Sequence, residues 1–452
     1  MNNWTSGKLL PFFSLILGLI LTVYRASISS ELQPVVDPYD SPSYFDFKLI
    51  GGVRMPIITF VFSRLETYEN IIMFQSVFSS LCWILLSQVI FALKLNRGIL
   101  LLFSILILSL GFSNQVLLLD GFINAESLNI SALILCISSG FLIIVNRSLT
   151  SYILFIFCIT FYAGVKSINA LSAVFLMFLF VTFLFVVGET RKRAGIILSG
   201  AGILLMSVFF FLFTKVDATP ILNTSALINQ RIWNVESWKS YTLEQGFPAE
   251  ARSTFLRFKS RNLGIPSDAA VSLQPDYKQW FNESGNSFLI KFMIDNPDYT
   301  FFGPIALPVF ERKVYLSSTI WGGAATGILY AEIFKNEWFK SWPMNRIFWS
   351  LDRSTGYIQF SLFLAIIGLA LLPNLFLKKY EDQLQKVIMF LLFTGLLHSY
   401  LAWWFGSTPS DIGRHQFPFA IVIRVAVIFS LIYLIQVSLI KARGLNHRIG
   451  SD

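Results

Sequence analysis

Apolar residues are grouped along the chain into long runs that are separated by short polar joints and by one long polar segment. Runs of about 20 apolar residues are long enough to cross a bilayer as helices. A backbone inside lipid must satisfy its own hydrogen bonds, so helices are expected throughout. The pattern predicts about ten spans: 9–25, 68–93, 98–113, 126–145, 149–165, 167–187, 195–213, 356–376, 386–405 and 417–440.

Basic residues are concentrated in alternate joints between these spans. Cytoplasmic joints of membrane proteins carry an excess of Lys and Arg, so the basic joints predict which side is cytoplasmic. If the N-terminus is cytoplasmic, all of them fall on that side and the C-terminus lies there too. They contain Lys94, Arg97, Arg147, Arg191, Lys192, Arg193, Lys378, Lys379, Lys441 and Arg443.

The same parity places residues 26–67, 114–125, the turn around 166, 214–355 and 406–416 on the outer side. The first run could instead be a signal peptide, but its length favours a retained span. The expected fold is an all-α polytopic membrane protein with about ten transmembrane helices. It has an N-terminal transmembrane module 1–213 with a first outer loop 26–67, an extracytoplasmic loop domain 214–355, and C-terminal helices with a cytoplasmic tail 356–452.

Composition agrees with this class and narrows it. The chain of 452 residues is 55% hydrophobic and only 13% charged. Its net charge of +9 sits largely in the basic joints, where orientation and anionic lipid already account for it, so no nucleic-acid partner is expected. The sequence contains no glycine-rich phosphate loop and no fixed-period repeat. The lipid bilayer is the first predicted partner.

Four basic residues are predicted on the outer side, against the usual charge bias: Arg54, Lys166, Arg414 and His415. Structural explanations exist, because Lys166 could snorkel between two helices and Arg414 could pair with Asp411. A shared functional explanation is a site that binds an anion on the outer side.

Two further residues lie about 10 Å deep in the last two predicted spans, at 1.5 Å per residue: His398 and Arg424. Ionisable groups at this depth usually face the bundle interior or a wet cavity and are functional candidates. The alternatives are a core histidine with a satisfied ring and a snorkelled arginine. His398 and Arg424 are therefore a candidate intramembrane polar site.

Three outer carboxylates are candidates for acid or base chemistry. Asp37 and Asp40 flank a Pro-Tyr pair, a turn-like setting in which Asp often bonds backbone N–H groups. Glu126 opens a predicted helix, where a carboxylate complements the positive helix end. The sequence has no clustered ligand set typical of a tight metal site, so neither a metal nor another cofactor is expected.

An acid that meets several cations at a membrane surface suits one reaction in particular. A general base deprotonates an acceptor hydroxyl, and positive charge stabilises a phosphate leaving group. A sugar phosphate attached to a lipid fits a site at the bilayer edge. The sequence therefore favours transfer of a sugar from such a donor.

At these residues the chain resembles the GT-C superfamily of membrane glycosyltransferases, which use polyprenyl-phosphate sugars. The similarity is one of pattern and covers the membrane half of the chain: Asp40-Ser41-x-x-Tyr44, then Arg54-x-Pro56, then Glu126, Lys166 and a late Arg414-His415. The resemblance implies that Asp40 is the general base, with Asp37 in reserve. It also implies that Arg54, Lys166 and Arg414 stabilise the phosphate, without a metal and with inversion at the anomeric carbon.

The expected activity is thus glycosyl transfer on the outer face of the cytoplasmic membrane. The donor would be a polyprenyl-phosphate-linked sugar and the acceptor a glycan, a lipid or a protein, for example in lipopolysaccharide or another envelope polymer. Two alternatives stay open: an O-antigen polymerase or ligase that uses lipid diphosphate-linked glycans, and a transporter. Trp233, Trp238 and Trp280 either stack on sugar rings or pack within the outer domain.

Overall fold

In the computed structural model, the described secondary-structure elements are helices. One isolated β-bridge, parallel in direction, joins Val35 and Phe122 among the described residues. It is an all-α membrane protein, as the sequence predicts. The structure describes residues 3–32, 34–36, 41–48, 54–93, 95–146, 148–186, 193–214, 219–261, 267–303, 347–349, 353–376, 383–406 and 409–449.

Five helices among the described residues are long and apolar enough to cross a membrane. A sixth crossing results if α4 (Arg97–Gly111) and the bent continuation through α5 (Asn114–Leu118) count as one, since their axes differ by 47°. The five are α1 (Asn3–Ser29), α3 (Tyr68–Val89) with η2 (Ile90–Ala92), α6 (Glu126–Asn146), α21 (Gln383–Phe405) and α22 (Pro409–Ile449).

Four more helices coincide with predicted spans: α7 (Leu149–Ala163), α8 (Ser167–Val186), α9 (Arg193–Thr214) and α20 (Arg353–Phe376). Their apolar stretches include Leu149–Ala163, Ile168–Phe178 and Ser361–Leu372, which are shorter than a full span. Five or six crossings therefore follow from the described part of the chain. The prediction of ten goes beyond it.

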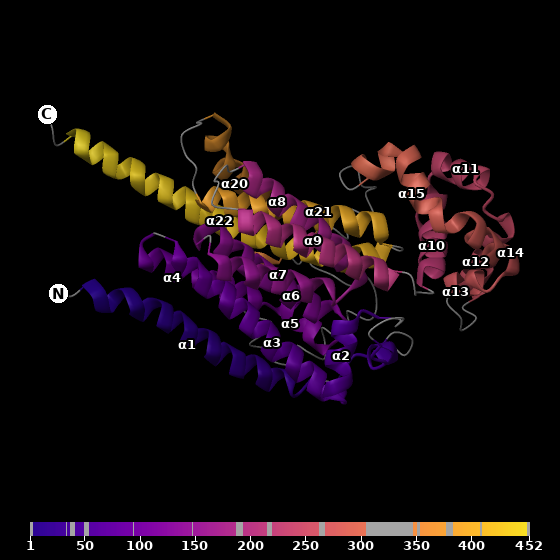
Figure 1. Ribbon diagram of the computed structural model, residues 1–452, viewed down its shortest axis with the longest axis horizontal. Coiled ribbons are helices and arrows are strands. Elements are labelled where there is room, and N and C mark those ends of the chain that lie inside the picture. The colour runs from indigo at the N-terminus through magenta and orange to yellow at the C-terminus, as the bar shows by residue number, and fades with distance from the viewer. Residues whose placement is uncertain are drawn as a thin grey trace.

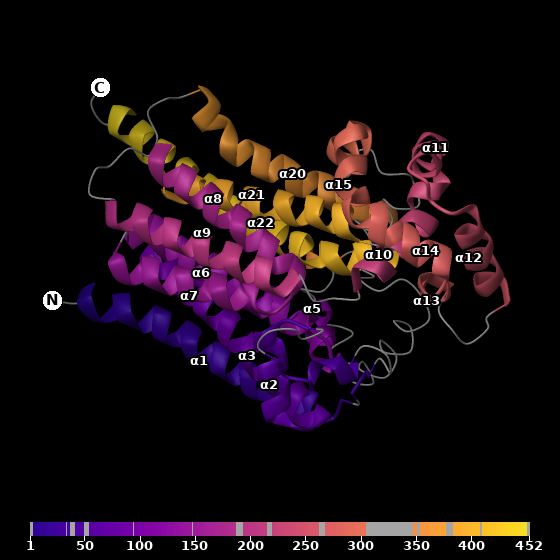
Figure 2. The same cartoon turned by 45° about the vertical axis from the view of Figure 1, so that its right-hand side comes forward.

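The long helices form one bundle whose two ends differ (Figures 1 and 2). Helix α1 begins and α22 ends at one end, which we call the terminal end. The short helix α2 (Pro56–Leu65) and the helices α10 to α15 lie at the opposite end, which we call the loop end. The described parts of the segments that the charge pattern assigns to one common side of a membrane thus gather at one end of the bundle.

Close packing in the bundle depends on small residues where helices meet. Trp83 of α3 is fully buried, and a Cβ added to Gly111 at the end of α4 would lie 2.3 Å from its ring. Glycine at 111 therefore allows the indole to pack directly against the α4 backbone.

The predicted outer domain contains a small helical unit, residues 219–303, with its own aromatic core. Trp280 is buried and donates to the Gln245 carbonyl, and Trp238 donates to Asp298. Trp233 packs beside Phe247. The three tryptophans therefore make packing contacts. The helices are α10 (Thr219–Gln230), η5 (Ile232–Asn234), α11 (Glu236–Glu244), α12 (Ala249–Arg261), α13 (Ser267–Ser272), α14 (Pro275–Trp280), η6 (Phe281–Gly285), α15 (Asn286–Asp295) and η7 (Asp298–Phe302).

This unit, the α10–η7 unit, is docked on the loop end of α21. Arg231 follows α10 and is buried against Trp403, with its guanidinium 4.3 Å from the indole centroid. Its Nη1 donates to the carbonyls of Trp403 and Gly406. A guanidinium that binds the last carbonyls of a helix also complements its negative end.

One predicted joint has a different structure from the expected one. Residues 114–125 were expected as an outer connection, but α5 and η3 (Leu119–Gly121) are buried. They include Asp120, which is completely enclosed. Hydropathy does not reveal this burial, because Asn114, Gln115 and Asp120 make the segment polar, while Arg25, the counter-charge of Asp120, lies 95 residues away in α1.

Candidate functional site

An enclosed ion pair fixes the loop-end segment that leads into α6. Arg25 of α1 and Asp120 of η3 are 2.7 Å apart, and both side chains have no exposed surface. Arg25 also donates to the Ser79 hydroxyl and to the Gly111 carbonyl, and Ser127 donates to Asp120. A buried pair of this kind needs such additional bonds to offset its desolvation.

Two polar pairs connect the start of α6 with the beginning of α8. One pair reaches the turn before α8, and the other reaches its first helical turn. The Lys166 ammonium is 2.6 Å from a carboxylate oxygen of Glu126, and neither side chain is more than 15% exposed. One helical turn further in, the Asn169 amide donates to the Asn129 side chain over 2.9 Å. Positions i and i+3 share one helix face, so Glu126 and Asn129 lie on the same face of α6, opposite Lys166 in the turn and Asn169 in the first turn of α8.

A histidine and a tyrosine meet beside these pairs. The Nδ1 atom of His398 lies 2.7 Å from the Thr394 carbonyl, and its Nε2 is bonded to the Tyr162 hydroxyl. A carbonyl can only accept, so Nδ1 carries a proton. In the neutral ring, a proton on Nδ1 leaves Nε2 as a hydrogen-bond acceptor, and the Tyr162 hydroxyl lies against it. His398 is therefore a buried histidine whose two nitrogens are both engaged.

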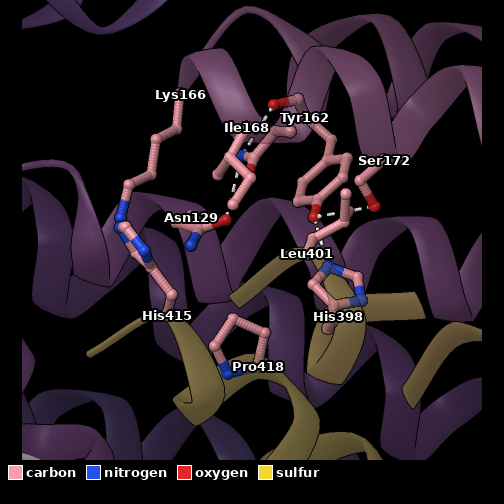
Figure 3. Close-up of a pocket in the computed structure, with 10 residues that line it drawn as sticks. Asn129, Tyr162, Lys166, Ile168, Ser172, His398, Leu401, His415 and Pro418 are labelled. Atoms are coloured by element: carbon pink, nitrogen blue, oxygen red, sulfur yellow. Dashed lines mark hydrogen bonds between the residues drawn. The ribbon is translucent and has the colours of Figure 1, made fainter. Parts of the chain in front are cut away.

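These groups line one pocket, which we call the His398 pocket (Figure 3). Lys166 and His415 point toward one another across it, and Tyr162 faces His398. The pocket has room for about one water molecule, so a larger ligand requires the walls to move. It is lined by Asn129, Tyr162, Lys166, Ile168, Asn169, Ser172, His398, Leu401, His415 and Pro418.

The first outer loop is bonded to both segments that carry the Glu126–Lys166 pair. Ser41, next to Asp40 in the sequence, donates to the Ile123 carbonyl over 2.9 Å, and Val35 pairs with Phe122. The Ile57 N–H donates to the Gly164 carbonyl over 3.1 Å. The loop is thus attached three residues before Glu126 and two residues before Lys166.

The motif residues Tyr44 and Arg54 also meet. Arg54 donates from Nε to the Ser43 hydroxyl over 2.8 Å, and its guanidinium carbon is 4.8 Å from the Tyr44 ring centroid. Tyr44 is buried, in the short helix η1 (Ser41–Tyr44). Arg54 therefore binds the η1 segment of the first loop and does not line the pocket.

The remaining predicted site residues fall into two groups. Asp37 and Asp40 lie outside the described residues, and for Arg414 only the helical backbone, one residue before His415 in α22, is described. Arg424 does not line the His398 pocket. It donates to the Phe348 carbonyl over 2.6 Å and covers the Trp349 ring. The expectation that His398 and Arg424 form one site is thus replaced by two separate environments.

No cluster of three or more His, Cys, Asp or Glu residues that could hold a metal ion occurs in the described part of the chain. In three comparisons, with protein-family models, with curated proteins and with solved structures, no match was found. The chemistry of the pocket is therefore deduced from its own residues.

Several residues of this region are absent from the sequence-based prediction. Asn129 and Asn169 follow Glu126 and Lys166 by three residues in otherwise apolar helices, and that repeated spacing was a usable signal. Arg25 could have been found as a charge at the end of an apolar run. Tyr162 carried no signal, because its partner His398 is 236 residues away.

Proposed function

We propose that the protein is an inverting glycosyltransferase that moves a sugar from a polyprenyl-phosphate donor to an acceptor hydroxyl at the loop end. The observation that carries this proposal is the attachment of the first outer loop to the two segments that carry Glu126 and Lys166. This attachment supports a site that combines an acid of the first loop with Lys166 and His415 of the pocket. The polyprenyl chain of the donor would lie between helices while its phosphate reached the loop end.

The proposed reaction is a direct displacement. Asp40, with Asp37 as the reserve, accepts the proton of the acceptor hydroxyl. The acceptor oxygen bonds to the anomeric carbon as the bond from that carbon to the phosphate oxygen breaks. Polyprenyl phosphate leaves with the bonding electrons, and positive charge from Lys166 and His415 stabilises it.

Arg54 and Arg414 complete the proposed phosphate site. Arg54 borders the first loop, and Arg414 precedes His415 in α22. Glu126 holds the Lys166 ammonium in position, and its carboxylate neutralises the lysine charge until the phosphate binds.

The proposal includes the full topology. We infer ten spans, with the loop end on the outer face of the cytoplasmic membrane and residues 214–355 as the extracytoplasmic domain. The basic joints and the common position of both chain ends at the terminal end support it. The acceptor would be a glycan, a lipid or a protein.

Donor consumption tests this function without knowledge of the acceptor. The purified full-length protein in nanodiscs is incubated with a set of polyprenyl-monophosphate sugars and with membrane extracts as acceptor source, and released polyprenyl phosphate is measured by mass spectrometry. Release from a monophosphate donor is expected. Turnover of lipid diphosphate-linked glycans alone would favour the polymerase or ligase alternative, and uptake into proteoliposomes without a glycosyl product would favour transport.

Asp40→Asn is the first variant to test in this assay. Loss of a general base costs about 10²- to 10⁴-fold in rate. Asp46→Asn is the matched control, because Asp46 is an exposed carboxylate of the same loop that pairs with Lys48. Asp37→Asn shows whether the reserve acid carries the function. Near-normal turnover by both Asp40→Asn and Asp37→Asn would exclude a base in this loop.

Lys166→Ala tests the phosphate site, with Lys48→Ala as the exposed lysine control. Weaker donor use is expected for Lys166→Ala at normal protein level, since a charge that faces the leaving group is lost. Unchanged KM and kcat would remove Lys166 from the mechanism.

A further inference from the structure

Four large apolar side chains are exposed on α15 and η7, two consecutive elements of the α10–η7 unit. Ile290 and Ile294 are 65% and 72% exposed and lie four residues apart on one face of α15. Phe301 and Phe302 of η7 are 59% and 61% exposed. We call these four residues the α15 patch. Exposed apolar side chains of this kind indicate a surface that contacts a membrane or another molecule.

Three hydrogen bonds fix the position of η7 on the membrane helix α21. The Tyr400 hydroxyl donates to the Phe301 carbonyl over 2.9 Å. The indole N–H groups of Trp403 and Trp404 donate to the carbonyls of Tyr299 and Thr300 over 2.8 and 3.0 Å. η7 therefore lies at the level of the aromatic residues that end α21.

The outward side of α21 leads directly to the patch. Met389, Phe393 and Leu396 are exposed and recur at the spacing of one helix face. Tyr400 continues that face by one more turn and is the residue bonded to Phe301. In a helix that crosses a membrane, an exposed apolar face is in contact with acyl chains. The α15 patch is thus the continuation of a lipid-facing stripe.

Charges on α15 and η7 are turned away from the patch or can reach headgroups. Asp295 accepts from Tyr241 and Asp298 from Trp238, so both acids face α11. Lys291 is exposed on α15, and a lysine can extend its ammonium to lipid phosphates while its stem stays in apolar surroundings. Figures 1 and 2 both show α15 on the bundle side of the unit, whereas α12 lies farther from the bundle.

We propose that the α15 patch inserts into the lipid leaflet at the loop end and anchors the α10–η7 unit to the bilayer surface. Aromatic residues such as Tyr400, Trp403 and Trp404 favour the headgroup level, which sets the depth of the patch at the boundary between headgroups and acyl chains. The partner is the bilayer itself, because the patch joins a face of α21 that lipid already covers. This anchoring does not depend on the glycosyltransferase proposal.

Spin-label accessibility tests the anchor in the full-length protein. Cys82, Cys136 and Cys158 are buried and are first replaced by Ala. Ile294→Cys and Phe302→Cys are then labelled with a nitroxide in phosphatidylcholine nanodiscs. Phe393→Cys on α21 is the lipid-facing reference, and Leu256→Cys on α12 is the matched control, since Leu256 is also an exposed apolar residue of this unit.

Labels at 294 and 302 are expected to collide more with oxygen than with a water-soluble nickel chelate, as at 393, and the label at 256 is expected to show the reverse. Ile290→Cys replaces either variant if it does not fold. Equal nickel accessibility at 294, 302 and 256 would overturn the proposal. Spin–spin broadening that disappears on dilution with unlabelled protein would also overturn it, because a second copy would then cover the patch.

Discussion

Arg25 and Asp120 are residues whose charges are enclosed completely, in a protein that is mostly apolar. Their pairing links α1 to the segment before α6, and Ser127 extends the same network to the turn that carries Glu126. At this scale the protein stabilises costly polar groups in pairs: Glu126 with Lys166, Asn129 with Asn169, and Tyr162 with His398. Each pair draws its members from segments that are separate in the sequence.

Arg25→Met should destabilise the protein by about 3–5 kcal/mol, because Asp120 would remain buried without its counter-charge. The double variant Arg25→Met with Asp120→Asn should recover most of this loss, since no unpaired charge is left. Thermal unfolding in detergent measures both, with the exposed Arg64→Met as control. Equal losses in the single and double variants would show that the ion pair is not the cause.

Tyr241 provides a pH-dependent test in the α10–η7 unit. Burial and the bond to Asp295 raise the pKa of Tyr241 to about 12, so the folded state favours the neutral phenol. Its contribution to stability is full below pH 10 and is lost as the pH rises through 12. The difference in alkaline absorbance between the wild-type protein and Tyr241→Phe should show one tyrosinate that forms only as the pH approaches 12.

Asp295→Asn is the control for that titration. It should lower the pKa of Tyr241 only part of the way towards 10, because the contribution of burial remains. A tyrosinate that already appears at pH 10 in the wild-type difference spectrum would contradict the predicted contact.

Helix α2 and the turn between α7 and α8 show how elements position the pocket. The Ile57 N–H is bonded to the Gly164 carbonyl, two residues before Lys166. A Cβ at Gly164 would lie 2.3 Å from Cδ1 and 3.1 Å from Cβ of Ile57. The absence of a side chain at 164 therefore allows α2 to approach the turn that carries the lysine.

Gly164→Ala should cost about 1–3 kcal/mol, because the added methyl group overpacks the contact with Ile57 and displaces α2. Gly200→Ala on α9 is a matched control, since its Cβ would meet nothing within 4 Å and alanine favours a helix. Unfolding midpoints distinguish the two variants. A loss for Gly200→Ala as large as that for Gly164→Ala would remove the steric explanation.

At the scale of the whole molecule, α2 and the helices α10 to α15 lie at the loop end, whereas α1 begins and α22 ends at the terminal end. The α10–η7 unit is joined to the bundle through Arg231, Tyr299 and Trp403. The unit therefore has a fixed place beside the end of α21, from which the α15 patch reaches the leaflet.

Arg231→Met should loosen this docking by about 2 kcal/mol, because two charge-assisted bonds to helix-end carbonyls are lost. About thirtyfold faster hydrogen exchange is expected at the junction with α21, since 1.4 kcal/mol corresponds to a factor of ten. Arg257→Met, an exposed arginine of α12, is the control. Unchanged exchange at the junction in Arg231→Met would show that the aromatic contacts alone hold the unit.

Hydropathy and charge are local properties of the chain, and they were enough to predict the helical membrane class and most helix positions among the described residues. Lys166 and His415 could be named as cations on the predicted outer side, Glu126 as a carboxylate at a helix start, and His398 as an ionisable group within a predicted span. The spacing of three residues from Glu126 to Asn129 and from Lys166 to Asn169 is also a local signal.

Tertiary packing decides which side chains of different helices pair. Partners that are far apart in the sequence produce no periodic pattern in either segment. The fold alone separated Arg424 from His398, enclosed Asp120 with Arg25 and brought Tyr162 into the pocket. It also attached the first outer loop, through Ser41 and Ile57, to the segments that carry Glu126 and Lys166. Polarity in the sequence indicates which side chains need a partner, and three-dimensional packing selects it.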